Sequence, residues 1–393
     1  MDVRPRFPLA PVLSGSALWR ARAPQPRSVL QAGAVRHVTS GRVAIVHALR
    51  AMGAGPGTVV LLPAYHSAAI VPPVLWCGAT AVFYKVRPDT SVDLDDIAGK
   101  LAGATVLLVT HYFGFLQDMP AIRAFCDAHS LLLLEDCAHS FFGEQAGRPV
   151  GAFGDYAIAS SMKFFPIYEG GCIVSARHSL ANLTLHGAGM GFELKSLLAA
   201  LENGFAYGRL GPLSAVLALP LRLRNYLWNK HKRARGGASA ALAPSSSDSS
   251  FQLEPVWIDK RASLFSRLVM ALSSTRRIVA RRRGNYQRLA SVLAELRGAR
   301  PLHATLPDGV CPWVFPMLCD DGDALAARLL AARIPLLRFG APAWPGVDAT
   351  TCSNSAALGR NVIALPCHQA LLDSELDAII VALREALQDR DFQ

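Results

Sequence analysis

The chain has 393 residues, of which 51% are hydrophobic and 18% are charged, which is enough for a large core and more than one domain. Its formal charge of +11 comes from basic residues spread along the chain, so we expect phosphorylated small molecules as partners and no nucleic acid. The eight cysteines form no CxxC pair. They predict buried free thiols in a reducing cytoplasm and no metal site.

Residues 1–34 are rich in arginine, and no acidic residue lies between Asp2 and Asp89. A transit peptide has this composition, but prolines at positions 5, 8, 11, 24 and 26 interrupt any amphipathic helix. We therefore expect a poorly ordered leader over residues 1–34 and a cytoplasmic protein. No apolar stretch in the sequence is long enough to span a bilayer.

From about residue 40 the sequence alternates helix-like and strand-like segments, which predicts a parallel sheet covered by helices. The expected helices lie at 42–52, 67–77, 94–101 and 120–129, and the expected strands at 58–62, 81–84, 105–110, 131–134, 156–160 and 172–175. In such sheets, ligands collect outside the carboxyl ends of the strands. The groups expected there are residues 63–66, 111–114, Asp136 and 160–163.

The composition changes after Gly191. Residues 192–255 form a helical and Ser-rich insertion, in which 192–235 is rich in leucine and ends in a basic cluster. Packing of 192–235 on the protein's own core is the favoured interpretation, and weak contact with a membrane surface is the alternative. Beyond it, a helical pattern at 261–296, a strand at 313–318 and helices at 323–333 and 373–387 predict a smaller α+β domain over 261–393, after a large domain over 35–260.

Two residues at expected strand ends suggest the chemistry. Lys163 lies six residues before Glu169-Gly170-Gly171, and Asp136 lies two residues after the expected strand at 131–134, in the acidic strand end Leu134-Glu135-Asp136. A lysine amine and a carboxylate are the two groups that pyridoxal phosphate requires. The amine forms a Schiff base with the aldehyde, and the carboxylate keeps the pyridine nitrogen protonated so that the ring can accept electrons.

Several motifs occur in an order that resembles the DegT/DnrJ/StrS family of aminotransferases. They are Thr39-Ser40-Gly41-Arg42, Pro63-Ala64-Tyr65, His111-Tyr112-Phe113-Gly114, Glu135-Asp136-Cys137-Ala138-His139, Gly151-Ala152-Phe153-Gly154-Asp155, Lys163 and Glu169-Gly170-Gly171. The resemblance implies fold type I, a mostly parallel seven-stranded sheet between helices with a smaller C-terminal α+β domain. It also implies pyridoxal phosphate as the cofactor and nucleotide-linked keto sugars as substrates.

The resemblance also implies roles for individual residues. Lys163 matches the Schiff-base lysine and Asp136 the partner of the pyridinium nitrogen. His139 occupies the position where the family has Gln or His near the cofactor's hydroxyl edge, although a histidine packed in the core is an alternative.

Ser40, Gly41 and Arg42 open a helix whose N–H groups can bind the cofactor phosphate. Ser160 is the expected hydroxyl ligand, with Ser161 as the alternative. His66 or Tyr65 would stack on the cofactor ring, because the aromatic residue that the family commonly has at this point is missing here.

The implied reaction is a ping-pong transamination from glutamate or glutamine to a keto sugar in polysaccharide or other sugar biosynthesis, catalysed by a homodimer. The family's asparagine-arginine-methionine motif is not recognisable, and residues 259–263 lie roughly where it would be. Two alternatives are a homologue that binds the cofactor but acts on a non-sugar carbonyl substrate, and a non-catalytic regulatory homologue.

Overall fold

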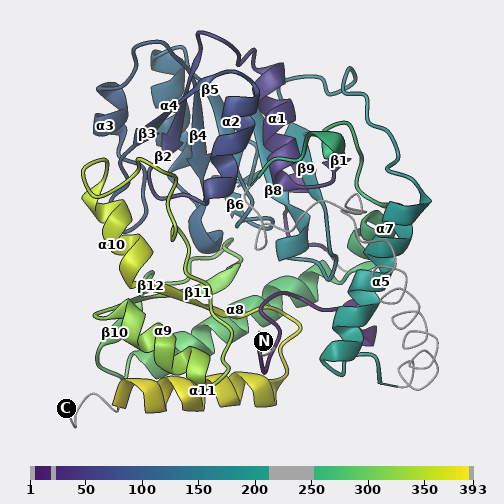
Figure 1. Cartoon of the computed structure of the whole chain (residues 1–393), viewed down its shortest axis with the longest axis vertical. Coiled ribbons are helices and arrows are strands. Elements are labelled where there is room, and N and C mark those ends of the chain that lie inside the picture. Colours follow the sequence, from purple (N-terminus) through teal and green to yellow (C-terminus); the bar gives the residue numbers. More distant parts are fainter. Residues whose placement is uncertain (1–4, 19–23, 212–251, 389–393) are drawn as a thin grey trace, which may run out of the picture.

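The computed structural model describes residues 5–18, 24–211 and 252–388. Two sheets organise this part of the chain, a seven-stranded one and a three-stranded one, and Figure 1 shows the larger sheet above the smaller. The Ser-rich segment and the basic cluster at 231–235 lie outside the described residues.

The large sheet follows the order β1-β9-β8-β5-β4-β2-β3. Its strands are β1 (Ala34–Val38), β2 (Val59–Pro63), β3 (Thr80–Tyr84), β4 (Ala104–Thr110), β5 (Leu132–Asp136), β8 (Tyr156–Ser160) and β9 (Gly171–Ser175). The five strands from β8 to β3 run parallel, and β9 is antiparallel to both β8 and β1. The mostly parallel seven-stranded sheet of the prediction is therefore confirmed.

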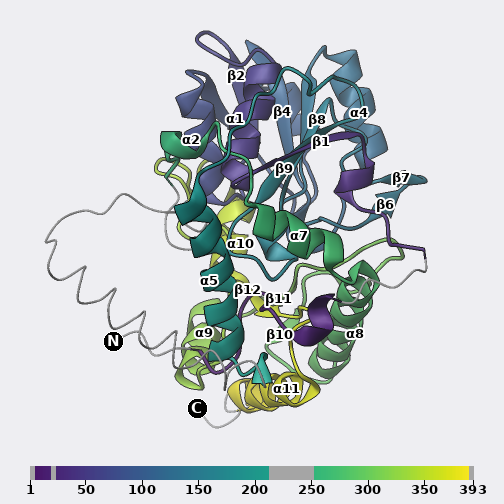
Figure 2. The same cartoon turned by 90° about the vertical axis from the view of Figure 1, so that its right-hand side faces the viewer.

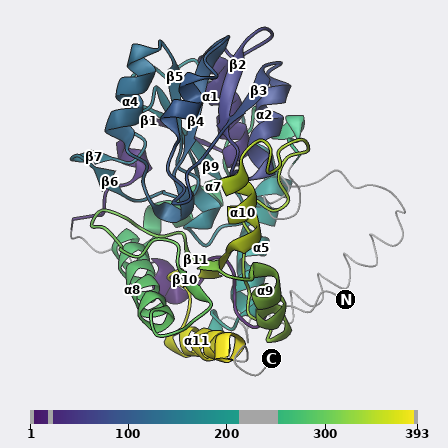
Figure 3. The ribbon, with the colours of Figure 1, turned by 90° about the vertical axis from the view of Figure 1, so that its left-hand side faces the viewer.

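Helices cover both faces of this sheet because its strands are apolar at nearly every position. Leu62 and Leu108 pack under α1 (Gly41–Ala51) and α2 (Val71–Trp76), and α2 follows the short helix η3 (Ala68–Ile70). Leu107 and Leu133 point to the opposite face, toward α3 (Leu94–Ala98) and α4 (Met119–Ala128). The helices thus form two layers around the sheet (Figures 1 and 3).

The small sheet is antiparallel and places β11 (Val314–Cys319) between β10 (Ala299–Pro301) and β12 (Val362–Pro366). It is surrounded by α8 (Thr275–Leu293), α9 (Gly322–Ala331), α10 (Ser353–Asn361) and α11 (Asp373–Gln388). Phe315 and Leu365 of this sheet share one continuous apolar core with Leu107 of the large sheet. A boundary near residue 260 remains a prediction.

Short elements connect these layers. They are η1 (Gly15–Leu18), η2 (Val29–Gln31), η4 (Tyr112–Gly114), η5 (Ser161–Lys163), η6 (Pro255–Trp257) and the hairpin of β6 (Glu144–Gln145) and β7 (Arg148–Pro149). Figure 2 shows α5 (Met190–Ala206) and α7 (Leu264–Leu272) side by side beneath the large sheet.

The expected helix at 261–296 is two helices. Ser274 caps α8 by accepting a hydrogen bond from the N–H of Arg277, and extended backbone at Ser273 ends α7. A serine that caps a helix start is favoured over a continuous helix, because it satisfies a backbone donor that would otherwise have no partner.

Several described residues of the predicted leader are buried. Phe7, Val12 and Leu13 are buried, and the carbonyl of Pro8 lies 2.9 Å from Nε2 of His368. The burial of these three apolar side chains offsets the conformational entropy that is lost when the segment is ordered. The described part of the leader therefore packs against the C-terminal half of the chain.

Helix α5 packs by its buried face, which includes Phe192, Ala200 and Gly204. This agrees with the favoured interpretation for the described part of 192–235. In residues 5–18, 24–211 and 252–388, no helix has the length and apolar character to cross a membrane.

Candidate functional site

The carboxyl ends of three neighbouring parallel strands meet the start of α1. β4 ends at Thr110, β5 at Asp136 and β8 at Ser160, and Thr110 lies directly opposite Asp136. A cavity of about 70 Å³ opens there. Its lining contains Thr39, Ser40, Gly41, Arg42, Ile45, Ser67, Ala69, Ile70, Thr110, Asp136, Ala138, His139, Ile158, Ser160, Met162, Lys163, Tyr168, Glu169 and Phe339.

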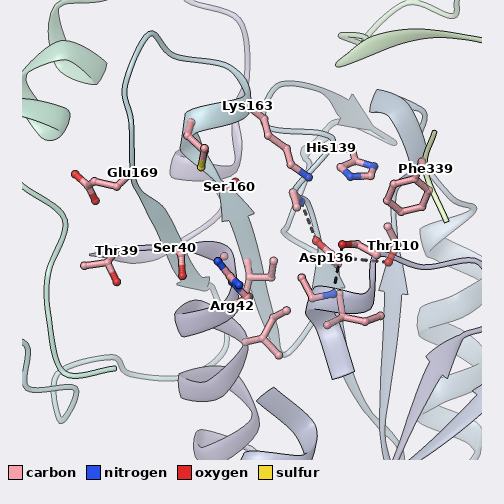
Figure 4. Close-up of a pocket in the computed structure, with 18 of the residues that line it drawn as sticks. Thr39, Ser40, Arg42, Thr110, Asp136, His139, Ser160, Lys163, Glu169 and Phe339 are labelled. Carbon is pink, nitrogen blue, oxygen red and sulfur yellow. Dashed lines mark hydrogen bonds between the residues drawn. The ribbon is translucent and has the colours of Figure 1, made fainter. Parts of the chain in front are cut away.

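Lys163 and Asp136 face the same space. Figure 4 shows the Lys163 amine and the Asp136 carboxylate entering the cavity from adjacent strand ends. The Asp136 carboxylate accepts hydrogen bonds from the N–H of Ala138 (2.9 Å) and the hydroxyl of Thr110 (3.3 Å). Burial raises the pKa of Asp136, and the Ala138 bond and the Lys163 charge partly oppose this shift. A buried carboxylate of this kind would be stabilised by a cationic partner.

Glu135 holds the strand end behind Asp136 in place. Its carboxylate accepts hydrogen bonds from the N–H groups of Gly151 (3.0 Å), Phe153 (2.6 Å) and Gly154. Nδ1 of His111 accepts a bond from the N–H of Gln117, so the ring proton lies on Nε2, 3.3 Å from Glu135.

A geometric metal-ligand group includes the same two residues. His111, Glu135 and Cys137 have their ligand atoms within 4.8 Å of one another. The hydrogen bonds to the backbone and between His111 and Glu135 account for the burial of these two side chains.

His139 is a neutral imidazole beside Lys163. Its Nδ1 accepts a hydrogen bond from the N–H of Phe113 (3.4 Å), which leaves the ring proton on Nε2. Burial and the nearby Lys163 charge hold the pKa of His139 well below its usual value. The ring stacks on Trp313, with 4.1 Å between centroids. The interpretation of His139 as a residue at the site thus agrees with its position, and its role toward a cofactor remains a prediction.

The start of α1, with Ser40, Gly41 and Arg42, lines the cavity and is the predicted anion cradle. Ser40 is the N-cap, and its hydroxyl accepts a hydrogen bond from the N–H of Val43 (3.3 Å). A Cβ atom on Gly171 would lie 2.5 Å from the carbonyl carbon of Ser40 and 2.7 Å from the nitrogen of Gly41. Gly171 is the first residue of β9, and only glycine fits this close to the backbone of α1. A larger residue would displace the first turn of α1, which glycine leaves open to a ligand.

Arg42 and Ser160 complete the polar side of the cavity, as Figure 4 shows. The guanidinium of Arg42 donates a hydrogen bond to the carbonyl of Gln252 (2.7 Å), which ties the returning chain to this helix start. Ser160 lines the cavity, whereas Ser161 is fully buried and does not.

Glu169 turns its carboxylate away from Lys163, toward α7 (Figure 4). Its Oε1 accepts hydrogen bonds from the hydroxyl (2.7 Å) and N–H (3.1 Å) of Ser263, the N-cap of α7. Burial raises the pKa of Glu169 to about 7. This buried carboxyl therefore joins the cavity wall to the first turn of α7.

The predicted ring-stacking residues are not in the cavity lining. His66 stacks on Phe83 with 5.0 Å between centroids. Tyr65 packs edge-on against Phe339 at the same separation and is 1% exposed. Aromatic neighbours on β3 and in the C-terminal half hold both rings, so their positions do not support stacking on a cofactor.

The sequence interpretation missed three residues at the site. Thr110 ends the expected strand at 105–110, and its contact with Asp136 follows from parallel pairing. Phe339 lines the cavity, and Trp313 lies with its ring centroid 4.3 Å from Nζ of Lys163. Both aromatic residues come from the distant C-terminal half, where no local motif marks them.

Part of the chain is similar in sequence to known proteins. Residues 28–218 match the model of the DegT/DnrJ/EryC1/StrS aminotransferase family. UDP-N-acetyl-3-dehydro-alpha-D-glucosamine 3-aminotransferase of Acidithiobacillus ferrooxidans is 36% identical over 38% of this chain and 43% of its own length. GDP-perosamine synthase of Vibrio cholerae is 33% identical over 36% of this chain and 40% of its own. The matched region thus spans less than half the length of either relative.

The fold is also that of solved aminotransferases. The aminotransferase TlmJ from Streptoalloteichus hindustanus superposes with a TM-score of 0.61 over 91% of this chain and 86% of its own, at 20% identity. This similarity confirms the predicted fold type I.

Proposed function

We propose, from the match of residues 28–218 to the model of the DegT/DnrJ/EryC1/StrS aminotransferase family, that the protein is a transaminase that transfers an amino group to a keto sugar. The observation that carries the proposal is the convergence of Lys163 and Asp136 on one cavity, opposite the anion cradle at the start of α1. Glutamate or glutamine is the proposed amino donor.

The residues present fit pyridoxal phosphate, the cofactor that the family indicates. The buried Asp136 carboxylate suits the protonated ring nitrogen, the Lys163 amine suits the aldehyde, and the first turn of α1 suits the phosphate. When bound, the cofactor withdraws electrons from the substrate carbon and thereby makes its proton acidic.

Each protein group would then have a distinct task. Lys163 accepts the proton from the substrate carbon at Nζ and returns it, as a general base and then a general acid. Asp136 keeps the ring nitrogen charged from its buried position. Nε2 of His139 carries a proton that it can donate to an oxygen in the cavity, while Ser40, Gly41, Arg42 and Ser160 hold the phosphate.

The proposed acceptor is a nucleotide-linked keto sugar. The names of two relatives contain a UDP-linked and a GDP-linked sugar. The net charge of +11 favours association with a diphosphate. We also propose that the protein is a cytoplasmic homodimer that acts in polysaccharide biosynthesis.

Spectra of the purified protein with pyridoxal phosphate test this function. Addition of glutamate or glutamine is expected to bleach the violet absorbance band and to produce one equivalent of the keto acid. Keto sugars linked to UDP, GDP or dTDP should then restore the band, as should the keto acid formed from the amino donor, because that half-reaction is reversible. Other simple keto acids, the substrates of the non-sugar alternative, should not. A protein that binds the cofactor but never bleaches with any amino donor would contradict the proposal.

A further inference from the structure

Trp313 lies against the amine of Lys163, and the proposed function does not yet explain this contact. Nζ of Lys163 is 4.3 Å from the centroid of the indole ring. At this separation the negative face of the ring attracts an ammonium group, and indole is the strongest of the aromatic side chains in this respect.

Hydrogen bonds hold the backbone of Trp313 in place. The N–H of Trp313 donates a hydrogen bond to the carbonyl of Phe113 (2.8 Å), and its carbonyl accepts one from the guanidinium of Arg282 (2.7 Å). A Cβ atom on Gly114, where φ is +106°, would lie 2.9 Å from the nitrogen of Trp313. The glycine thus lets the two backbones approach closely, and these contacts fix the backbone from which the indole projects. The ring itself stacks on His139.

The lysine is tied to the same framework. The buried Arg282 guanidinium donates a second hydrogen bond, to the carbonyl of Lys163 (2.9 Å), and its Nε donates to Oε1 of Gln369 (2.9 Å). Gln369 in turn donates to the carbonyl of Phe164 (2.7 Å). One arginine therefore sets the separation between the turn that carries Lys163 and the strand entry that carries Trp313.

We propose that Trp313 is a positioning residue, which receives the Lys163 ammonium on its indole face whenever this lysine is not covalently attached to the cofactor. The inference rests on the proposed function, because only a lysine that alternates between attached and free states requires such a place. The free amine gains a proton from the substrate carbon and later returns it, so it exists as an ammonium for part of each cycle. Stacking on Trp313 holds that proton near the cavity.

Other charged groups also act on this amine. The Asp136 carboxylate attracts the ammonium from β5, whereas the buried guanidinium of Arg282 repels it, and His139 is neutral on its side of the indole ring. The indole contribution must therefore be separated from that of Asp136. Fluorine atoms on the tryptophan ring provide this separation, because they weaken the negative ring face and leave Asp136, Arg282 and the ring shape nearly unchanged.

The test places mono-, di- and trifluorinated tryptophan at position 313 of the full chain. Each protein is treated with acetic anhydride over a range of pH, and mass spectrometry of the peptide that contains Lys163 gives the pH at which half of this lysine has reacted. Both the protein loaded with pyridoxamine phosphate and the protein without cofactor are measured. The midpoint is expected to fall stepwise with each fluorine, by about half a pH unit to one unit over the series. The midpoint should fall as far in Trp313→Leu as in the trifluorinated protein, and it should fall less in Trp313→Phe.

The control is the same fluorinated series at Trp76, which lies 4.3 Å from the guanidinium of Arg50 on another face of the molecule. Those proteins should leave the Lys163 midpoint unmoved. A midpoint that is constant across the series at 313, or that moves equally with fluorine at 76, would overturn the inference. The measurements without cofactor decide the question even for a protein that fails to transaminate, so failure of the proposed function can be distinguished from failure of this inference.

Discussion

The guanidinium of Arg282 donates a hydrogen bond to the carbonyl oxygen of Lys163, 2.9 Å away and 119 residues earlier in the chain. Its other N–H groups bond to Pro312, Trp313 and Gln369, and its plane lies 4.5 Å from the centroid of Phe164. One fully buried side chain therefore connects α8, the entry to β11 and the lysine turn.

Arg282→Lys is expected to reduce the free energy of unfolding by about 2–4 kcal/mol. Lysine retains the charge but cannot reproduce the fork of N–H donors, so buried carbonyl groups lose their partners. Denaturant unfolding measures this loss. The matched control is Arg288→Lys, because Arg288 is half exposed and pairs with Asp377 at the surface; its effect should stay within about 0.5 kcal/mol. Equal losses in both variants would contradict the role of Arg282 as a connection.

Asp136→Asn is expected to lower kcat by at least about a hundredfold, since the amide has the shape of the carboxylate but not the charge that holds a ring proton. Thr110→Val removes one hydrogen bond from Asp136 and serves as the control, with a much smaller loss. A pyridoxal phosphate analogue methylated on the ring nitrogen carries its positive charge permanently, and it should restore part of the Asn variant's rate. Full activity of Asp136→Asn with the natural cofactor would exclude this role.

Gly171→Ala is expected to destabilise the protein by about 1–3 kcal/mol and to weaken the binding of pyridoxal phosphate, because the new methyl group would displace the first turn of α1. Fluorescence titration gives the affinity and thermal unfolding gives the stability. Gly284→Ala is the control: a Cβ atom there meets nothing within 4 Å, and alanine should stabilise the helix by about 0.5–1 kcal/mol. Unchanged cofactor affinity in Gly171→Ala would contradict the assignment of the cradle.

Glu169 makes a pH-dependent contribution to stability. Its pKa is raised from 4.5 to about 7 in the folded protein, so the folded state binds more protons than the unfolded state between these values. The contribution is therefore present below the unfolded pKa and is lost as the pH rises through about 7. It amounts to at most about 3 kcal/mol.

Glu169→Gln should remove this dependence, because the amide oxygen can still accept the bonds from Ser263. The variant is expected to match the natural protein near pH 5 and to exceed its stability at pH 8. Urea unfolding across this range provides the measurement, with the exposed Glu295→Gln as the control. A Gln variant that is less stable at pH 8 would refute the predicted sign.

The sequence located the part of the site that local patterns encode. Asp136 and Lys163 each stand next to an apolar strand, and parallel strands bring their carboxyl ends to one edge, so their convergence follows from chain order alone. Ser40 and Gly41 were likewise visible as a helix start. Trp313 and Phe339 come from the C-terminal half, and their approach depends on how the two sheets pack, which no local spacing encodes.

Where the structure differs from what the sequence suggested, the causes are similar. The rings of Tyr65 and His66 follow a strand end, but partners distant in sequence, Phe339 and Phe83, hold them away from the cavity. The helical spacing of apolar residues continues from α7 into α8, so the sequence pattern did not indicate the break at Ser273 and Ser274. Burial of Phe7, Val12 and Leu13 outweighed the arginine-rich composition that suggested a loose leader.

Covalent capture of the cofactor shows whether Lys163 forms the Schiff base. The full chain is incubated with pyridoxal phosphate, reduced with borohydride, digested and analysed by mass spectrometry. We predict a single phosphopyridoxyl group on Lys163 in the natural chain and none in Lys163→Arg. Labelling of a different lysine such as Lys195, or equal labelling of the Arg variant, would contradict it.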